Sequence, residues 1–424
     1  MKKEVIKRDN YVINYIKTKK FKSCHIQVLF KQKLDVKEVT VNSLLEDFLQ
    51  YSSYDFPSRR ELLIEYEYLY DAYVDGNLTR VGDNLFHKFD LDFLDPKYCD
   101  DDYLEEVIKL LSNVILKPNF NNGDYTNRCF EICKNNYRDY LTSMREKPMK
   151  YAFNKAIGIF GKNTSTGVAL DGNLEDLEKT TVNDLKKAYD RMLNNTECYI
   201  YIVGNLNKKE VVSYLDKYFA SIKKYSNNNT LFINNESRED SLYIEEIGPF
   251  KQDSLIIFYN LDLKSRKEKY VSSALFNFIL GSGGLTSKLY DNVREKNSLC
   301  YTIFSNFSPN DNFLFIGAGI NKKDKDLCLK LIDKCLNEMI NGDFSERDIK
   351  DSIKAFENKL KNISSSIDSI LAYNFDLDFR DRYEAKEFIE VMKSVKKEDI
   401  MKIARKAKKN VVFLLCGEDN NETN

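Results

Sequence analysis

The sequence predicts an α+β protein built as a tandem duplication: two homologous α/β sandwich halves, each a mixed, largely antiparallel sheet with helices packed on it. Three observations support this fold class. At 424 residues, the chain exceeds the usual size of a single hydrophobic core. A polar segment near the midpoint separates two stretches of regular hydrophobic pattern. Several patterns of the first stretch recur, in the same order, in the second.

The midpoint segment, residues 223–246, reads KKYSNNNTLFINNESREDSLYIEE and is rich in asparagine, serine and charge. An ordinary long surface loop has the same composition, but such loops are uncommon inside compact domains. We therefore expect a linker here, between a first domain at residues 1–222 and a second at residues 247–424.

The first recurring pattern is a strand followed by a helix. The strand-like run HIQVLF precedes residues 43–49 (SLLEDFL), and SLIIFYN precedes residues 273–279 (SALFNFI). The last pattern is a lysine-rich helix that leads to a β-branched strand ending in glycine, at residues 199–205 and again at residues 411–419. Order and spacing together favour duplication over chance.

Between these two patterns, an amphipathic helix and a Phe-x-x-x-Asp segment occur in each half. The Phe-x-x-x-Asp segments begin at Phe120 and Phe344. Apolar residues at helical spacing form one stripe in each half: Leu104, Val107, Ile108, Leu111 and Ile115 in the first, and Cys328, Leu331, Ile332, Cys335 and Met339 in the second. We expect these stripes to face the two cores.

Composition excludes several classes of protein. Lys+Arg 65 against Asp+Glu 66 leaves a net charge of -1, which gives no overall field for nucleic acid or an anionic membrane. The basic start, MKKEVIKRDN, lacks the apolar core of an export signal, and no run is long enough to cross a bilayer. We expect a cytoplasmic protein with no membrane insertion and no nucleic-acid partner.

The nine cysteines are scattered, which favours reduced thiols over a disulfide framework. Cys129 and Cys133 are four residues apart and could share one helix face. Because no histidine or further cysteine is near them in sequence, buried packing is the preferred interpretation over a metal site.

The segment from Gly281 to Tyr301, GSGGLTSKLYDNVREKNSLCY, carries the most functional information. Gly281, Gly283 and Gly284 predict a tight turn beside a bound chain. Arg294 offers a fork of N–H donors, and Tyr301, seven residues later, offers an O–H donor. Without further context, Arg294 is a helix-end cation and Tyr301 a half-buried strand aromatic.

The whole segment resembles a signature in the second half of the insulinase- and pitrilysin-type zinc metallopeptidases, the inverzincin family that includes the mitochondrial processing peptidases. The resemblance extends over nearly the whole chain. It implies two related halves that close like a clam shell around an extended peptide, held partly by strand addition to a sheet edge. It also implies that Arg294 and Tyr301 stabilise the charge that develops on the cleaved carbonyl, and that Gly281, Gly283 and Gly284 bind substrate.

Active members of this family carry His-x-x-Glu-His on the first helix of the first half, followed by a glutamate as third zinc ligand. The resemblance places Ser43, Glu46 and Asp47 over the three functional positions of that motif. Both zinc-binding histidines are therefore replaced, and Ser43 and Asp47 are poor substitutes for imidazole. Glu46 is either a retained general base or a solvated helix carboxylate. Glu131 is the candidate in the third-ligand region.

The two histidines of the chain, His25 and His87, occur in strand-like segments far apart in sequence. They form no ligand motif, and we expect partly exposed strand side chains. We therefore predict that this chain holds no metal or other cofactor of its own.

These features lead to a functional hypothesis and two alternatives. The chain is expected to be the zinc-less subunit of a heterodimeric peptidase, supplying Arg294 and Tyr301 to peptide bound at the zinc of a His-x-x-Glu-His partner. A non-enzymatic peptide-binding or scaffolding subunit would explain the lost motif as well. An independent cysteine hydrolase is disfavoured, because no cysteine has a recognisable neighbouring base.

Overall fold

The computed structural model describes residues 3–224, 230–250 and 252–418. These residues form two compact units that are not continuous in sequence. The first contains the described parts of Met1–Thr142, Leu170–Thr230 and Ser364–Tyr373. The second contains those of Ser143–Ala169, Leu231–Ile363 and Asn374–Asn424. A segment of the N-terminal half therefore folds with the second unit.

The first unit contains a six-stranded sheet in the order β1-β2-β6-β3-β5-β4. Only the β2–β6 pair is parallel. The strands are β1 (Lys3–Lys7), β2 (Tyr11–Lys17), β3 (Ser23–Lys33), β4 (Tyr73–Val81), β5 (Asn84–Leu94) and β6 (Glu197–Gly204).

The second unit contains a five-stranded sheet in the order β7-β11-β8-β10-β9. Its one parallel pair is β7–β11. The strands are β7 (Leu242–Gly248), β8 (Asp253–Asn260), β9 (Cys300–Ser308), β10 (Phe313–Ile320) and β11 (Lys408–Gly417). Strands β2, β6, β3, β5 and β4 of the first sheet thus correspond, in order and direction, to β7, β11, β8, β10 and β9 of the second. The predicted duplication and mixed sheets are confirmed.

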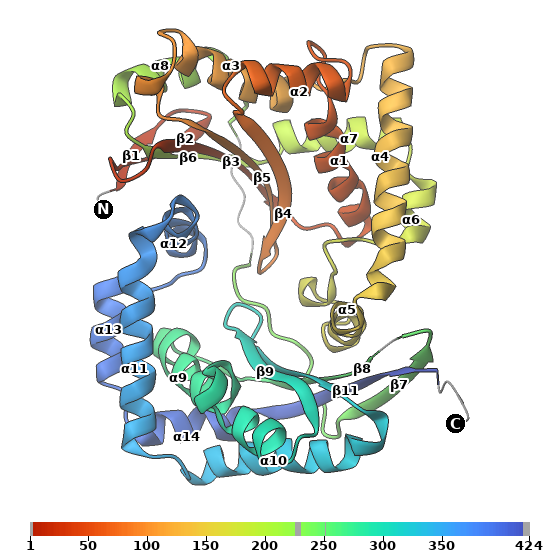
Figure 1. Cartoon of the computed structure of the whole chain (residues 1–424), viewed down its shortest axis with the longest axis vertical. Helices are drawn as coiled ribbons and strands as arrows, with labels where there is room; N and C mark the ends of the chain where they lie inside the picture. The colour runs from red at the N-terminus through yellow and green to blue at the C-terminus, as the bar shows by residue number, and fades with distance from the viewer. Residues whose placement is uncertain (1–2, 225–229, 251, 419–424) are drawn as a thin grey trace. The chain divides into compact units, whose positions relative to one another are not determined.

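Helices of the first unit pack on one face of its sheet (Figure 1). They are α1 (Val39–Tyr51), α2 (Arg59–Tyr68), α3 (Tyr103–Leu116), α4 (Asp124–Ser143), α6 (Leu174–Lys179), α7 (Val182–Asn194) and α8 (Lys208–Tyr218). Capping boxes fix the starts of α2 and α7, where Ser58 pairs with Glu61 and Thr181 with Asp184. The predicted stripe on α3 is buried in the core.

The second unit contains α5 (Pro148–Phe160), α9 (Ser273–Asn277), α10 (Lys325–Asn341), α11 (Glu346–Lys361), α13 (Ala385–Lys393) and α14 (Lys397–Lys406). Helix α12 (Ile367–Phe379) has residues grouped with each unit. Helix α9 is flanked by the π-helical segments η5 (Glu268–Ser272) and η6 (Phe278–Ser282). In the predicted stripe on α10, all residues except the partly buried Leu331 are fully buried.

The second sheet is covered on both faces by different helices. One face packs against the helices of residues 268–295 and against α10 and α14, in a core that contains Leu255, Ile257 and Ile316. The other face packs against α5, whose Ala152, Ala156 and Phe160 are buried with strand residues. Figure 1 shows α5 lying across β8 and β11. Small alanines allow this close approach of helix and sheet.

Strand β7 begins at Leu242, inside the segment expected to be a linker, and residues 225–229 of that segment lie outside the described residues. Asp419, the last residue of the second strand pattern, also lies outside them. No helix in the described part of the chain has the length and apolar character needed to span a bilayer.

Candidate functional site

The degenerate zinc-motif positions lie on α1 of the first unit, and each is held by local contacts. Ser43 is buried, and its hydroxyl donates a 2.6 Å hydrogen bond to the carbonyl oxygen of Leu170. Burial, together with the neighbouring Asp75 carboxylate, raises the pKa of Asp47 to about 6. Neither side chain is arranged as an open metal ligand.

Glu46 is buried, with 3 % of its surface exposed, so the expectation of a solvated helix carboxylate is wrong. Its Oε1 lies 2.5 Å from Nδ1 of His87, which is completely buried on β5. A Cβ on Gly76 of β4 would lie 2.9 Å from Glu46 Oε2, so the carboxyl group is packed against the sheet. The strand geometry of β4 and β5 encloses this side chain.

Burial favours the neutral forms of both Glu46 and His87. Burial raises the pKa of Glu46 well above its usual range, and the Asp47 and Asp75 carboxylates raise it further. Burial lowers the pKa of His87 to about 3. The second ring nitrogen of His87 lies 3.1 Å from Nε2 of Gln32, so the imidazole is held at both ends.

Helix α4, the region expected to supply a third zinc ligand, presents other side chains to α1. Glu131 is exposed on α4. Cys133 Sγ lies 3.8 Å from the Asp47 carbonyl oxygen, and Tyr137 donates to the carbonyl oxygen of Asp171. Cys129 and Cys133 are buried on α4, in agreement with their predicted role in packing.

Zinc does not fit these residues. The Ser43 hydroxyl and the Glu46 carboxyl are engaged in hydrogen bonds within the fold. Throughout the described ranges, no group of three or more His, Cys, Asp or Glu side chains is arranged to hold a metal ion. This donor set cannot support metal hydrolysis of the kind that active family members perform.

His25 is also buried, so the expectation of partly exposed histidines is wrong for both. Its ring nitrogens lie 2.9 Å from an Asp90 oxygen and 2.7 Å from an Asp92 oxygen. Burial lowers the pKa of His25, but the two carboxylates outweigh that effect and raise it to about 9. This charged cluster on neighbouring strands β3 and β5 stabilises the sheet.

The second predicted cluster lies in the second unit, where a tight turn joins the π-helical segment η8 (Tyr290–Glu295) to β9. The Ser298 N–H donates to the Arg294 carbonyl, and the Leu299 N–H donates to the Val293 carbonyl. Ser298 has a φ of 52°, which lets the chain reverse within a few residues. Segments of π-helix occur often at functional sites.

Arg294 is partly buried at the end of η8. Its guanidinium carbon lies 4.8 Å from the ring centroid of Tyr290, which orients the cation by a cation–π contact. Burial raises the pKa of the Cys300 thiol to about 11, and the Arg294 cation lowers this pKa by a smaller amount. The Arg294 cation is therefore among the charges that act on Cys300, the first residue of β9.

Tyr301 is displayed by a β-bulge. In the β9–β10 ladder, Cys300 pairs with Ile320 and Thr302 pairs with Gly319, which leaves Tyr301 as the extra residue. Tyr301 is 75 % exposed. It is therefore not the half-buried strand aromatic expected without the family resemblance. A bulge at an edge strand re-aims a side chain, and here it directs a phenol toward solvent beside the Arg294 turn.

The three glycines have different environments. Gly281 is buried, and a Cβ there would lie 2.7 Å from Leu289 Cδ1 and 2.8 Å from the backbone nitrogen of Ser305. Gly283 packs against Phe278. Gly284 has a φ of +64°, with nothing within 4 Å of a Cβ. Gly281 therefore sets the approach of the helical segment to β9, and Gly284 permits the turn.

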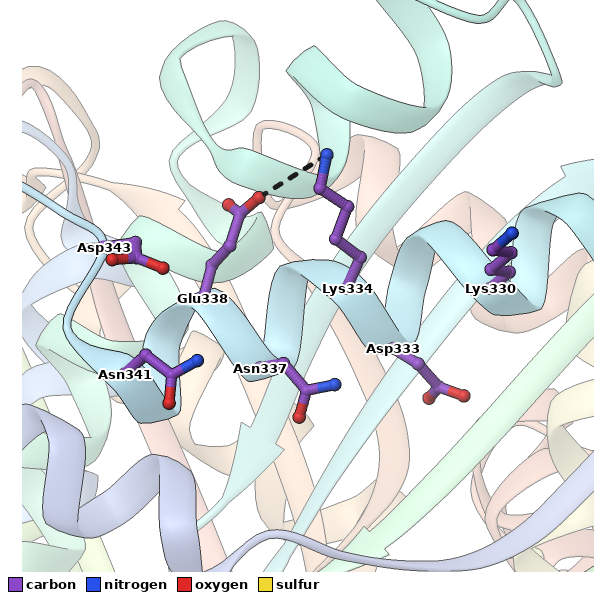
Figure 2. A pocket seen from close by; sticks show the side chains of 7 residues that line it. All are labelled: Lys330, Asp333, Lys334, Asn337, Glu338, Asn341 and Asp343. Atoms are coloured by element: carbon purple, nitrogen blue, oxygen red, sulfur yellow. Dashed lines mark ion pairs between the residues drawn. The ribbon is translucent and has the colours of Figure 1, made fainter.

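None of these residues lines the pocket of about 630 Å³ on α10. Figure 2 shows its lining side chains, among them Lys334 and Glu338, projecting from successive turns of that helix. The two are 3.9 Å apart, and Glu338 also pairs with Lys288 at 2.6 Å. This charged, shallow surface is typical of a solvated helix face.

Comparison with known proteins identifies the family. Residues 179–356 match the family model described as the peptidase M16 inactive domain. A relative in Bacillus subtilis (strain 168), the "Probable inactive metalloprotease YmfF", is 26 % identical over 97 % of each chain. The chain is thus similar to the insulinase-like M16 family. The predicted resemblance to that family is thereby confirmed.

Solved structures agree with this M16 assignment at the level of the fold. A conserved protein from Enterococcus faecalis V583 superposes with a TM-score of 0.90, at 23 % identity, over 99 % of this chain and 100 % of the other. A structure titled peptidase M16 inactive domain, from Pseudomonas fluorescens, superposes with a TM-score of 0.79, at 16 % identity, over 99 % and 98 %.

Proposed function

We propose that this M16 chain is the zinc-less subunit of a heterodimeric peptidase and that it binds peptide for a homologous partner carrying His-x-x-Glu-His. The observation that carries the proposal is the display of Tyr301: a β-bulge leaves it 75 % exposed at the end of the turn that contains Arg294. A tyrosine retained only for packing would bury more of its ring.

Arg294 and Tyr301 supply the donors that such a role requires. The guanidinium, oriented over Tyr290, presents several N–H groups, and the exposed phenol adds one O–H group. Both suit a peptide carbonyl or the oxyanion that forms when water attacks it. The partner would contribute the zinc and the activated water.

The first unit is consistent with a chain that leaves zinc binding to its partner. The side chains at its motif positions are engaged within the fold, with Ser43 bonded to Leu170 and Glu46 to His87. The Bacillus subtilis relative is named as a probable inactive metalloprotease, which agrees with a chain that does not hydrolyse peptides alone. We place the protein in the cytoplasm, in line with its cysteines, which are free thiols in the structure.

The proposal is tested by co-expressing the tagged chain with its zinc-bearing homologue and purifying the complex through the tag. Zinc-dependent peptide hydrolysis is then compared between the wild-type complex and complexes carrying Arg294→Ala or Tyr301→Phe. A fall in kcat/KM with intact assembly supports a shared site. Tight assembly with unchanged hydrolysis in both variants would instead support the scaffolding alternative.

A further inference from the structure

An apolar pocket of about 500 Å³ lies in the second unit. It lies on the sheet face that α5 partly covers, beside the start of that helix. Its lining residues come from the start of α5 and from β8, β9 and β10: Lys147, Pro148, Met149, Lys150, Phe153, Gln252, Ile256, Phe304 and Phe315. Its lining is mostly apolar, as it is in many ligand sites.

Two glycines of β10 allow residues of the pocket wall to pack close to that strand. Gly317 and Gly319 of β10 lie on the same sheet face as Phe315. A Cβ on Gly317 would lie 2.8 Å from Phe304 Cζ, and one on Gly319 would lie 2.6 Å from Gln252 Nε2. Any larger residue at these positions would push the pocket walls apart.

The walls are aromatic and partly exposed. Phe315 lies 4.8 Å from Phe153 and 5.8 Å from Phe304, measured between ring centroids. Phe304 is 36 % exposed although it is large and apolar. It belongs to β9, the edge strand of the sheet and the strand that displays Tyr301. An edge strand can pair with an added extended chain, whose alternate side chains then point toward the sheet face.

The rim carries positive charge. Lys147 and Lys150 are the charged residues of the lining, which contains no carboxylate. Helix α5 begins here, and its N-cap residue, Lys147, makes no side-chain capping bond. The first-turn N–H groups and the positive end of the helix dipole therefore add to the attraction for an anion.

We infer that this pocket binds a bulky apolar side chain of an extended peptide that runs along β9, with a carboxylate of the same peptide held by Lys147, Lys150 and the start of α5. The inference rests on the proposed peptide-binding function and specifies its substrate class. The apolar walls select an aromatic or large aliphatic side chain, and the basic rim selects an acidic residue beside it.

The test uses the full-length chain and fluorescein-labelled nine-residue peptides on a Ser/Thr background, measured by fluorescence anisotropy. One amidated peptide carries a central Phe followed by Asp. In two others, Ala replaces Phe or Asn replaces Asp. A fourth ends in Phe with a free carboxylate, which distinguishes a terminal carboxylate from a side-chain one.

We expect the Phe peptide to bind about 10-fold more tightly than the Ala peptide, since burying an aromatic ring contributes more than 1 kcal/mol. In Phe304→Ala, this ratio should fall below about 3-fold. The matched control is Tyr243→Ala on β7, the opposite edge of the same sheet, where Tyr243 is 43 % exposed. The control should keep the full ratio.

Charge reversal gives a second readout if Phe304→Ala folds poorly. Lys147→Glu/Lys150→Glu should abolish the preference for Asp over Asn, whereas Lys155→Glu, at an exposed position of the same helix, should retain it. Equal binding of the Phe and Ala peptides, no binding of any peptide, or an unchanged ratio in Phe304→Ala would each overturn the inference. The proposed function is tested separately by hydrolysis assays of the complex. It fails if Arg294→Ala and Tyr301→Phe leave the rate of hydrolysis unchanged.

Discussion

Glu46 of α1 and His87 of β5 share a buried hydrogen bond, with 2.5 Å between Oε1 and Nδ1. The family resemblance assigns Glu46 to the position of the general base in active members. Here burial favours the neutral form of each group, and the bond joins the first helix to the sheet. The Glu46 carboxyl group is therefore part of the core of the first unit.

The first prediction concerns that bond. Glu46→Gln should change the free energy of unfolding by less than about 1 kcal/mol, because an amide replaces a neutral carboxyl group without losing the contact to His87. Glu46→Ala should cost about 2–4 kcal/mol, since it leaves a cavity and an unpaired imidazole. Urea denaturation measures both, with exposed Glu131→Gln as control. Equal losses in Glu46→Gln and Glu46→Ala would contradict the neutral pair.

The second prediction concerns pH. The folded pKa of His25 is about 9, above its unfolded value of about 6.5, so its stabilising contribution is complete below pH 6.5 and is lost as pH rises through 9. The free energy of unfolding should fall by about 2–3 kcal/mol across that window.

His25→Gln should flatten this pH slope, as measured by urea titration at several pH values. The control is His87→Gln, because the pKa of His87, at about 3, lies outside the window and its removal should leave the slope intact. A wild-type protein equally stable at pH 6.5 and pH 9 would count against the His25–Asp90–Asp92 cluster.

The third prediction concerns metal. Because Ser43 and Glu46 are engaged in hydrogen bonds, EDTA should shift the Tm of the isolated chain by less than about 1 °C. The same treatment should abolish hydrolysis by the proposed complex, in which the partner would bind the zinc. Mass spectrometry of the isolated chain that finds one firmly held zinc per molecule would refute this account of the first unit.

The fourth prediction separates packing from turn geometry in the glycine segment. Gly281→Ala should cost about 1–3 kcal/mol, because the added methyl group meets Leu289 and the backbone of β9. Gly284→Ala should cost about 1 kcal/mol from its positive φ alone. Thermal unfolding compares the two. A smaller loss for Gly281→Ala than for Gly284→Ala would show that Gly281 does not fix the approach to β9.

The sequence predicted the duplication because each repeated pattern is local. A strand followed by a helix or an amphipathic stripe can be recognised from adjacent residues, and both sheets follow the same order. Arg294 and Tyr301 are predicted as site residues from the family resemblance of the segment around them. The bulge that exposes Tyr301 is not predicted, since it depends on pairing with Gly319 and Ile320 of β10.

The burial of the histidines could not be predicted from their own strands. His25 is paired by Asp90 and Asp92 across the sheet, and His87 is paired by Glu46 from a helix about forty residues earlier. Likewise, the sequence does not identify the sheet that α5 covers. The packing of this helix against β8 and β11 depends on long-range contacts.

The central claim is tested most directly by the kcat/KM of the zinc-bearing complex with Arg294→Ala, relative to wild type. The matched control is Arg347→Ala on α11, whose side chain is 89 % exposed. Removing a donor to the developing oxyanion should lower kcat/KM about 100-fold, with the complex and its zinc content unchanged and the control near wild type. Equal kcat/KM in all three complexes would contradict the shared site.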